Sequence, residues 1–149
     1  MLLKRGFASL VDEWLKAADY IHREGNPNVV MCERGIRTFE TSTRFTLDLN
    51  AVVYVKDRTR LPVIVDPSHA VGISALVSRL SLASAAAGAD GLIVEVHSDP
   101  SKALSDGIQA LTLKGFDEMM NQLSRVLRAV DRSLEIGRAS CRERVLASV

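Results

Sequence analysis

Short apolar runs rich in β-branched residues recur along the chain, and each ends abruptly in charged or polar residues. Runs of this kind between turn signals are typical of strands that are buried on both faces of a parallel sheet. Their starts lie about thirty residues apart, which is the length of one βαβ unit. The four expected strands lie at residues 1–3, 28–32, 63–65 and 91–94.

Amphipathic helices are predicted between these strands and after the last one. Apolar residues repeat at helical spacing across residues 11–21, and Ser9 with Asp12 fits a capping box at the start of that helix. Residues 51–55 alone would also suit a strand. We predict a helix there, capped by Asp48, because two parallel strands need a crossover between them. Further helices are expected at residues 74–87 and 116–130.

Strands that alternate with helices, and that carry polar groups at their carboxyl ends, predict an α/β fold of the (β/α)8, or TIM, barrel type. A complete barrel takes about 200–250 residues. This chain of 149 residues offers about four βα units, so we expect a partial barrel at residues 1–133. Residues 134–149 are rich in arginine and resemble the translation of a common sequencing-adapter oligonucleotide. We expect them to be a non-native or disordered tail.

Composition and charge exclude several classes of partner. The net charge is +1 and no basic stripe appears, so neither nucleic acid nor an anionic membrane is expected as a partner. No apolar run approaches the roughly 20 residues that span a bilayer, and the first residues lack the layout of a signal peptide. The two cysteines, Cys32 and Cys141, form no disulfide framework, so we expect a cytoplasmic location.

Three residues at expected strand ends or in the following loop are candidate metal ligands. His69, Glu95 and Asp106 offer one imidazole and two carboxylates, a set that suits a divalent ion such as manganese, iron, cobalt or zinc. Three ligands would leave coordination positions open for a substrate or for a missing fourth ligand. The alternative from spacing alone is that these residues are ordinary hydrogen-bonded polar groups on the rim of a barrel.

Lys4 and Arg34 form a second candidate site, because each closes an expected strand close to a glycine. Arginine can hold a phosphate or carboxylate through two hydrogen bonds, and lysine acts as a point charge. If both face one cavity, they would bind a small phosphorylated or carboxylated anion. The alternative is that they pair with Glu33 or Asp66. Cys32 would share a face with Arg34, and we expect it to be a small buried hydrophobic residue.

Polar motifs follow one another in order along residues 1–130. They are Leu3-Lys-Arg-Gly6, Cys32-Glu-Arg-Gly-Ile-Arg-Thr-Phe-Glu40, Thr43-Arg44, Thr46-Leu-Asp-Leu49, Asp66-Pro-Ser-His69, Glu95-Val-His97 and Ala103-Leu-Ser-Asp-Gly107. Together they resemble the carboxyl-terminal half of 3-deoxy-D-arabino-heptulosonate 7-phosphate (DAHP) synthase. The resemblance is to its shorter bacterial class, which is related to 3-deoxy-D-manno-octulosonate 8-phosphate synthase.

This resemblance implies the last four βα units of a (β/α)8 barrel. It implies a transferase that condenses phosphoenolpyruvate with erythrose 4-phosphate and releases phosphate, at the entry to the shikimate pathway to chorismate and the aromatic amino acids. It also implies a divalent metal, often manganese, held by His69, Glu95 and Asp106 together with a cysteine from an earlier strand. Full-length members are expected to be homo-oligomers.

By the same resemblance, Lys4 and Arg34 hold phosphoenolpyruvate, and Lys4 and His69 take catalytic roles. The other expected substrate-binding residues are Asp66, Ser68 and His97.

The motifs also depart from the family pattern in three places. Phe45 stands where asparagine is common, Ser98 stands where proline is common, and residues 70–73 lack a basic residue. These departures concern the binding of the aldose phosphate and leave the metal set unchanged. The octulosonate synthase is the alternative enzyme, although residues 36–40 favour the heptulosonate synthase. The other alternative is a half-barrel that binds anions without turnover, and we expect these residues alone to have little or no activity.

Overall fold

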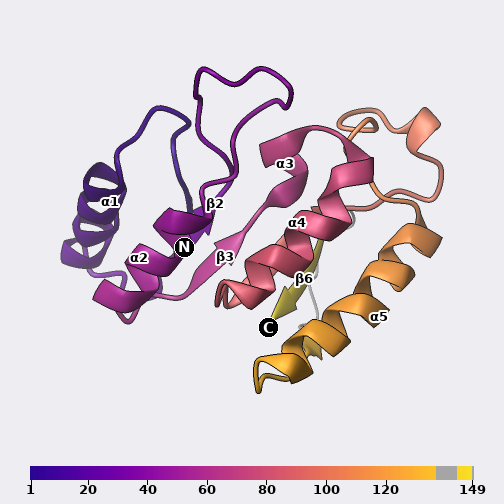
Figure 1. The fold of residues 1–149 in the computed structure, drawn as a ribbon. Helices are drawn as coiled ribbons and strands as arrows, with labels where there is room; N and C mark the ends of the chain where they lie inside the picture. The colour runs from indigo at the N-terminus through magenta and orange to yellow at the C-terminus, as the bar shows by residue number, and fades with distance from the viewer. Residues whose placement is uncertain (137–143, 149) are drawn as a thin grey trace.

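The computed structural model describes residues 1–136 and 144–148. Four parallel strands stand side by side in chain order, and helices cover one face of the sheet (Figure 1). The strands are β1 (Leu2–Lys4), β2 (Val30–Glu33), β3 (Val63–Val65) and β4 (Gly91–Glu95). The long helices are α1 (Val11–Arg23), α2 (Leu49–Arg58), α4 (Ser74–Ala86) and α5 (Leu113–Ala129). The predicted partial (β/α)8 barrel is confirmed.

The main hydrophobic core lies between the sheet and the helices. Successive strand residues point to opposite faces, and Met31, Val63 and Leu92 are fully buried on the face that the helices cover. The other face carries a smaller buried cluster of Cys32, Ile64 and Ile93. Both faces are therefore apolar, as expected for strands of a barrel.

The crossover between β2 and β3 is helical, as predicted. The carboxylate of Asp48 accepts the N–H of Ala51 at 3.1 Å and so caps α2. Among the helices of residues 1–136, none has both the length and the apolar character needed to cross a membrane.

The start of α1 differs from the predicted one. The capping box expected at Ser9 and Asp12 is wrong, because the N–H of Leu10 donates to the carboxylate of Glu13 at 2.8 Å. The N–H of Ser9 donates instead to the carbonyl of Gly6 at 3.0 Å. This turn shifts the start of the helix by one residue.

A five-residue helix, α3 (Pro67–Val71), follows β3 and was not predicted. Asp66 caps it by accepting the backbone N–H of His69 at 3.0 Å, and Gly72 ends it in the left-handed conformation with φ +69°. A single 3-10 turn, η1 (Pro100–Lys102), follows β4 and begins in the same way at an aspartate and a proline. Both short helices lie at the carboxyl edge of the sheet, where they shape the loops of the candidate site.

Residues 134–149, which we predicted to be a non-native or disordered tail, are described in part. Here β6 (Arg144–Ser148) pairs antiparallel with β4, and β5 (Glu135–Ile136) pairs with β6. The physical reason is that β4 is the last strand of the parallel sheet, and its open edge offers backbone groups to another strand. A non-native origin of these residues stays a prediction. Cys141 lies outside the described residues.

Candidate metal and anion site

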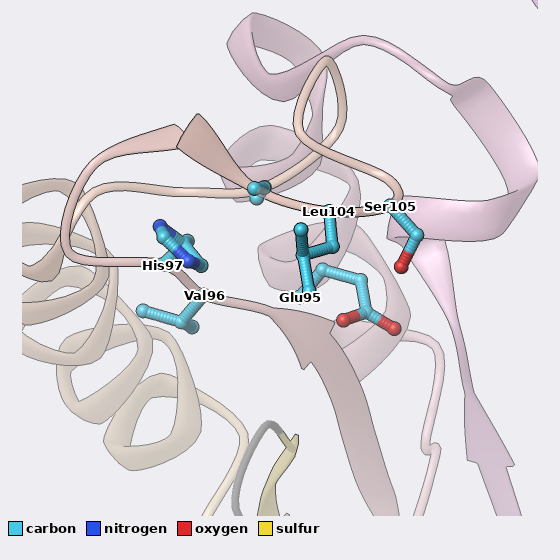
Figure 2. A pocket seen from close by; sticks show the side chains of 7 residues that line it. Glu95, Val96, His97, Leu104 and Ser105 are labelled. Carbon is cyan, nitrogen blue, oxygen red and sulfur yellow. The ribbon is translucent and has the colours of Figure 1, made fainter. Parts of the chain in front are cut away.

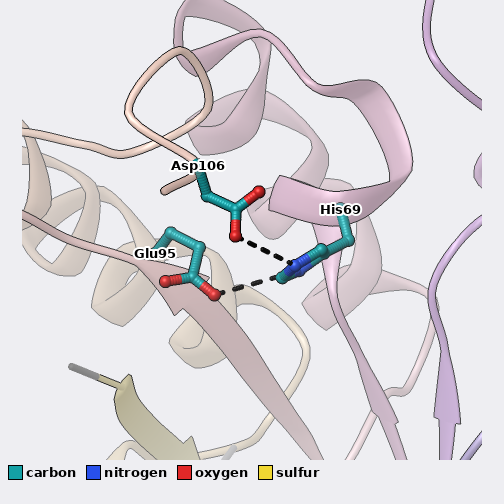
Figure 3. A group of neighbouring side chains, drawn as sticks. All are labelled: His69, Glu95 and Asp106. Carbon is teal, nitrogen blue, oxygen red and sulfur yellow. Dashed lines mark ion pairs between the residues drawn. The ribbon is translucent and has the colours of Figure 1, made fainter. Parts of the chain in front are cut away.

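Three polar side chains meet at the carboxyl ends of β3 and β4 (Figure 3). His69 comes from α3, Glu95 ends β4, and Asp106 lies in the loop before α5. One possible ligand atom from each lies within 4.8 Å of the other two. His69 Nε2 lies 3.9 Å from Asp106 Oδ2, and His69 Nδ1 lies 3.9 Å from Glu95 Oε1. An imidazole and two carboxylates this close together fit one divalent ion.

The buried carboxylate of Asp66 orients the imidazole of His69. Its two oxygens lie 3.0 and 2.9 Å from Nδ1, and one of them also accepts the backbone N–H of His69. Because an ionised carboxylate only accepts hydrogen bonds, it selects the tautomer in which Nδ1 carries the proton. The lone pair of Nε2 is then left for a metal ion, an arrangement common around metal-bound histidines.

Lys4 reaches the same carboxylate from β1. Its Nζ donates to Asp66 Oδ2 at 2.7 Å, so the alternative in which Lys4 pairs with Asp66 is confirmed. Burial opposes the ionisation of Asp66, but hydrogen bonds from His69 and Lys4 outweigh burial and hold its pKa below the usual range. The Lys4 side chain remains 31% exposed, and an ammonium has three donors. Lys4 can therefore contact a bound anion while it pairs with Asp66.

Ser68 and His97 are both neighbours of Glu95. The Ser68 hydroxyl is fully buried and accepts the backbone N–H of Glu95 at 3.1 Å, which ties α3 to the end of β4. His97 and Glu95 line a cavity of about 110 Å³ (Figure 2). The Glu95 carboxylate points away from the His97 ring in this view, and His97 Nδ1 accepts the N–H of Asp99 at 3.0 Å. The structure thus brings His97 to the edge of the site and leaves it outside the metal group.

Arg34 follows β2 and pairs with no acidic side chain in the described part of the chain. Its guanidinium carbon lies 5.0 Å from the ring centre of Phe45, a cation–π contact. Within residues 1–136, Arg34 makes neither an ion pair nor a side-chain hydrogen bond, so the pairing with Glu33 or Asp66 that we considered is wrong for this residue. A half-buried guanidinium with free N–H groups suits a phosphate or carboxylate.

An ion cluster that was not predicted lies beside the two strand ends. Nη1 of Arg5 is 2.9 Å from Glu33 Oε2 and 2.8 Å from Asp48 Oδ2, and only 5% of the Arg5 side chain is exposed. Glu33 is fully buried and also accepts the N–H of Gly35 at 2.7 Å. Burial raises the pKa of Glu33 in spite of the hydrogen bonds from Arg5 and Gly35. The cluster fixes the backbone on both sides of Arg34.

The alternation of side chains along a strand was the signal for this cluster. Adjacent strand residues face opposite sides, so Lys4 and Arg5 cannot both point into one site. The same holds for Glu33 and Arg34. Lys4 and Arg34 therefore face the candidate site, and Arg5 and Glu33 contact each other.

Cys32 is buried in the small cluster with Ile64 and Ile93, which confirms the expectation of a buried hydrophobic residue. Burial, with a contribution from the negative charge of Asp66, raises the pKa of its thiol to about 12. A thiol with such a pKa is protonated at neutral pH and is a poor metal ligand. Among the described residues, Cys32 does not belong to the possible metal group.

Comparison with known proteins agrees with this geometry. The family model described as the DAHP synthetase I family matches residues 1–130. A phospho-2-dehydro-3-deoxyheptonate aldolase from Thermotoga maritima is 48% identical over 130 residues, which are 87% of this chain and 38% of that protein. A 2-dehydro-3-deoxyphosphooctonate aldolase from Desulfosudis oleivorans is 33% identical over 116 residues, which cover 70% of this chain and 41% of that protein.

Solved structures give the same relationship. A truncated form of 3-deoxy-D-arabino-heptulosonate 7-phosphate synthase from Thermotoga maritima matches with a TM-score of 0.87 and 48% sequence identity. The match covers 89% of this chain and 50% of the solved chain. The chain thus spans half of this solved structure and about two fifths of the length of these curated relatives.

Proposed function

This chain belongs to the DAHP synthetase I family, and we propose that it supplies the carboxyl-terminal half of the active site of a DAHP synthase. The reaction is the condensation of phosphoenolpyruvate with erythrose 4-phosphate to give DAHP and phosphate. The observation that carries the proposal is the convergence of His69, Glu95 and Asp106 within 4.8 Å, linked through Asp66 to Lys4. The cytoplasmic location and the homo-oligomeric state of the full-length enzyme stay predictions.

His69, Glu95 and Asp106 are the residues that would hold a divalent metal. Their mixed nitrogen and oxygen donors suit manganese, our first candidate, and also iron, cobalt or zinc. Such a metal supplies Lewis-acid polarisation of the aldehyde oxygen of erythrose 4-phosphate. A fourth ligand would come from the other half of the barrel.

Lys4 and Arg34 are assigned to phosphoenolpyruvate. Arg34 makes no side-chain hydrogen bond within residues 1–136, so its N–H groups suit bidentate binding of a phosphate or carboxylate, and Lys4 adds a partly exposed ammonium. Holding the anion in place and offsetting its charge would contribute through orientation and electrostatics. We also assign Lys4 a proton-transfer role, since its Nζ connects through Asp66 to His69.

The chemical step follows from the two substrates. The third carbon of phosphoenolpyruvate bonds to the aldehyde carbon, whose oxygen takes up a proton. Water adds to the second carbon and loses a proton, and the resulting hemiketal phosphate releases phosphate to leave a ketone. Asp66 and Ser68 are fully buried, so we propose that they support binding through the residues they orient. His97, on the wall of a cavity shared with Glu95, is positioned to contact a substrate directly.

The second candidate function is that of an octulosonate 8-phosphate synthase, because relatives of that kind share about a third of the aligned residues. The 48% identity to the heptulosonate enzyme favours DAHP synthesis. The two activities differ in the aldose phosphate, which is erythrose 4-phosphate for the seven-carbon product and a sugar phosphate one carbon longer for the eight-carbon product.

A chimeric enzyme tests the proposal. Residues 1–130 would replace the matching part of the Thermotoga maritima relative, and phosphate release would be measured with each aldose phosphate in the presence of Mn²⁺. We expect turnover with phosphoenolpyruvate and erythrose 4-phosphate, and none when His69→Ala is added. A folded chimera that is inactive with both aldoses would contradict the proposal. The chain of 149 residues alone should show little or no turnover, because it holds only part of the metal and phosphate ligands.

A further inference from the structure

The loop that carries the candidate metal ligand Asp106 buries neither of its large apolar side chains. This Asp106 loop, residues 103–110, contains Leu104 and Ile108, which are both almost fully exposed. Asp106 itself is 39% exposed and adopts a left-handed conformation with φ +57°. A cavity of about 490 Å³ lies along the same loop. The position of the carboxylate therefore depends on the few polar contacts that the loop makes.

Gln109 is the buried anchor of this loop. Its side chain is 4% exposed, and its backbone N–H donates to the carbonyl of Asp106 at 3.1 Å. Its side-chain Oε1 accepts from Nη1 of Arg44 at 3.3 Å. The other side-chain atom, Nε2, is buried and has no hydrogen-bond partner among residues 1–136. Arg44 is thus the one polar contact of this amide in the described part of the chain.

Arg44 is fixed on its other side to α3, the helix of His69. Its backbone N–H donates to the carbonyl of Val71 at 3.2 Å, and the next N–H, of Phe45, donates to the carbonyl of Ala70 at 2.8 Å. Its guanidinium carbon lies 5.4 Å from the centre of the Phe45 ring. Gly72 leaves room for the close approach, since a Cβ there would lie 3.0 Å from the Cβ of Arg44.

We propose that Arg44 is a positioning residue that acts through Gln109 to hold Asp106 in place against His69. The inference rests on the proposed metal site and deepens it. Arg44 thereby joins two elements that each contribute a ligand. Its backbone contacts α3, which carries His69, and its side chain contacts the loop of Asp106, 37 residues further along the sequence. Ligands held in register before binding lose less freedom when a metal binds, so the contact raises metal affinity.

Manganese titration of the unmodified chain and of three variants tests the proposal. Binding of Mn²⁺ to the 149-residue chain would be measured by calorimetry for Arg44→Ala, Gln109→Ala and the double variant. Both single variants should lose about tenfold in affinity, the size typical of residues that support metal ligands. The double variant should lose no more Mn²⁺ affinity than the single variant that binds Mn²⁺ less tightly, because the two residues act through one contact.

The matched control is Arg37→Ala. Arg37 lies in the same long loop, is exposed, and stacks its guanidinium 5.0 Å from the ring centre of Phe7. Its loss should leave Mn²⁺ affinity within twofold of the unmodified chain. Equal affinities of Arg44→Ala and Arg37→Ala would overturn the inference, as would strictly additive losses.

Hydrogen exchange without metal provides a second readout. The backbone N–H groups of Gln109 and Ala110 both donate to the backbone carbonyl of Asp106 at 3.1 Å. In Arg44→Ala these N–H groups should exchange faster than in Arg37→Ala. Unchanged exchange would overturn the inference. If the unmodified chain binds no Mn²⁺, or binds it as well after His69→Ala, the metal site and this inference both fail. If His69→Ala abolishes binding and Arg44→Ala does not weaken it, only the role of Arg44 fails.

Discussion

Oδ2 of Asp66 lies 2.9 Å from Nδ1 of His69, and the same carboxylate oxygen is 2.7 Å from Nζ of Lys4. One buried carboxylate therefore connects a candidate metal ligand with a candidate anion ligand. The connection explains why an acidic residue with no exposed surface stands at the end of β3. It also means that changes at Asp66 act on both halves of the site.

Replacement of Asp66 by asparagine is expected to weaken Mn²⁺ binding by about tenfold to a hundredfold, because residues that orient a ligating histidine have effects of that size. The neutral amide no longer fixes the proton on His69 Nδ1. Calorimetric titration with Mn²⁺ measures the effect. The control is Asp19→Asn, which removes an exposed carboxylate paired with Arg23 at 2.8 Å. Similar affinities for the two variants would contradict the prediction.

The pKa of Asp66 should lie below its ordinary value, and the pKa of Glu33 should lie above its ordinary value. The pKa of Asp66 is lowered, so its contribution to stability is fully present above about pH 4, near the unfolded pKa, and is lost as the pH falls through the folded pKa. The pKa of Glu33 is raised, so its contribution decreases as the pH rises from its unfolded pKa of about 4.3 to the folded value. Carboxyl-carbon NMR titration measures both midpoints, and a midpoint of Asp66 above that of Glu33 would refute this assignment.

Replacement of Arg5 by methionine is expected to lower the free energy of unfolding by about 3–5 kcal/mol at neutral pH, because Glu33 is then left as an uncompensated buried charge. Urea denaturation measures the loss. The effect should shrink on acidification, as protonation removes the charge of Glu33. The control Arg23→Met removes an exposed guanidinium and should change stability by less than about 1 kcal/mol. A loss that is independent of pH would show that Glu33 is not the cause.

Gly25 and Gly35 have the same φ angle, so a comparison of their alanine variants separates backbone strain from steric crowding. Gly35 and Gly25 both have φ +90°, but a Cβ at Gly35 would lie 2.7 Å from the Cβ of Phe45 and 3.0 Å from Cα of Ala70, whereas a Cβ at Gly25 has nothing within 4 Å. Gly25→Ala should cost about 1–2 kcal/mol of stability through backbone strain alone. Gly35→Ala should cost a further 1–3 kcal/mol or so for overpacking. Equal costs, measured by urea denaturation, would contradict the packing at Gly35.

The regular elements were predictable because their signals are local. Apolar runs identified all four parallel strands, and helical spacing identified α1, α4 and α5. The helix α2 followed from topology, since its valines alone also suit a strand. The five residues of α3 are too few to show a helical period, although Asp66 and Gly72 carried its capping signals. The error at the start of α1 arose because the turn at Gly6 competes for the N–H of Ser9.

The convergence of the candidate metal ligands was predictable, and the contacts that support them were less so. Parallel strands bring their carboxyl ends to one edge, so the meeting of His69 with Glu95 followed from the fold. The contact of Arg44 with Gln109 joins residues 65 positions apart, and that of Arg5 with Glu33 joins residues 28 apart. Such pairs depend on how loops pack, and no periodicity in the sequence encodes them.

Strand β6 has a consequence for any completion of the barrel. The hydrogen-bonding edge of β4 accommodates a single neighbour, and Arg144–Ser148 occupies it in antiparallel orientation. A parallel strand arriving to close the ring at that position must first displace these five residues. The segment thus acts as a competitor of barrel closure, and the edge of β1 is the easier point of entry for a complementary half.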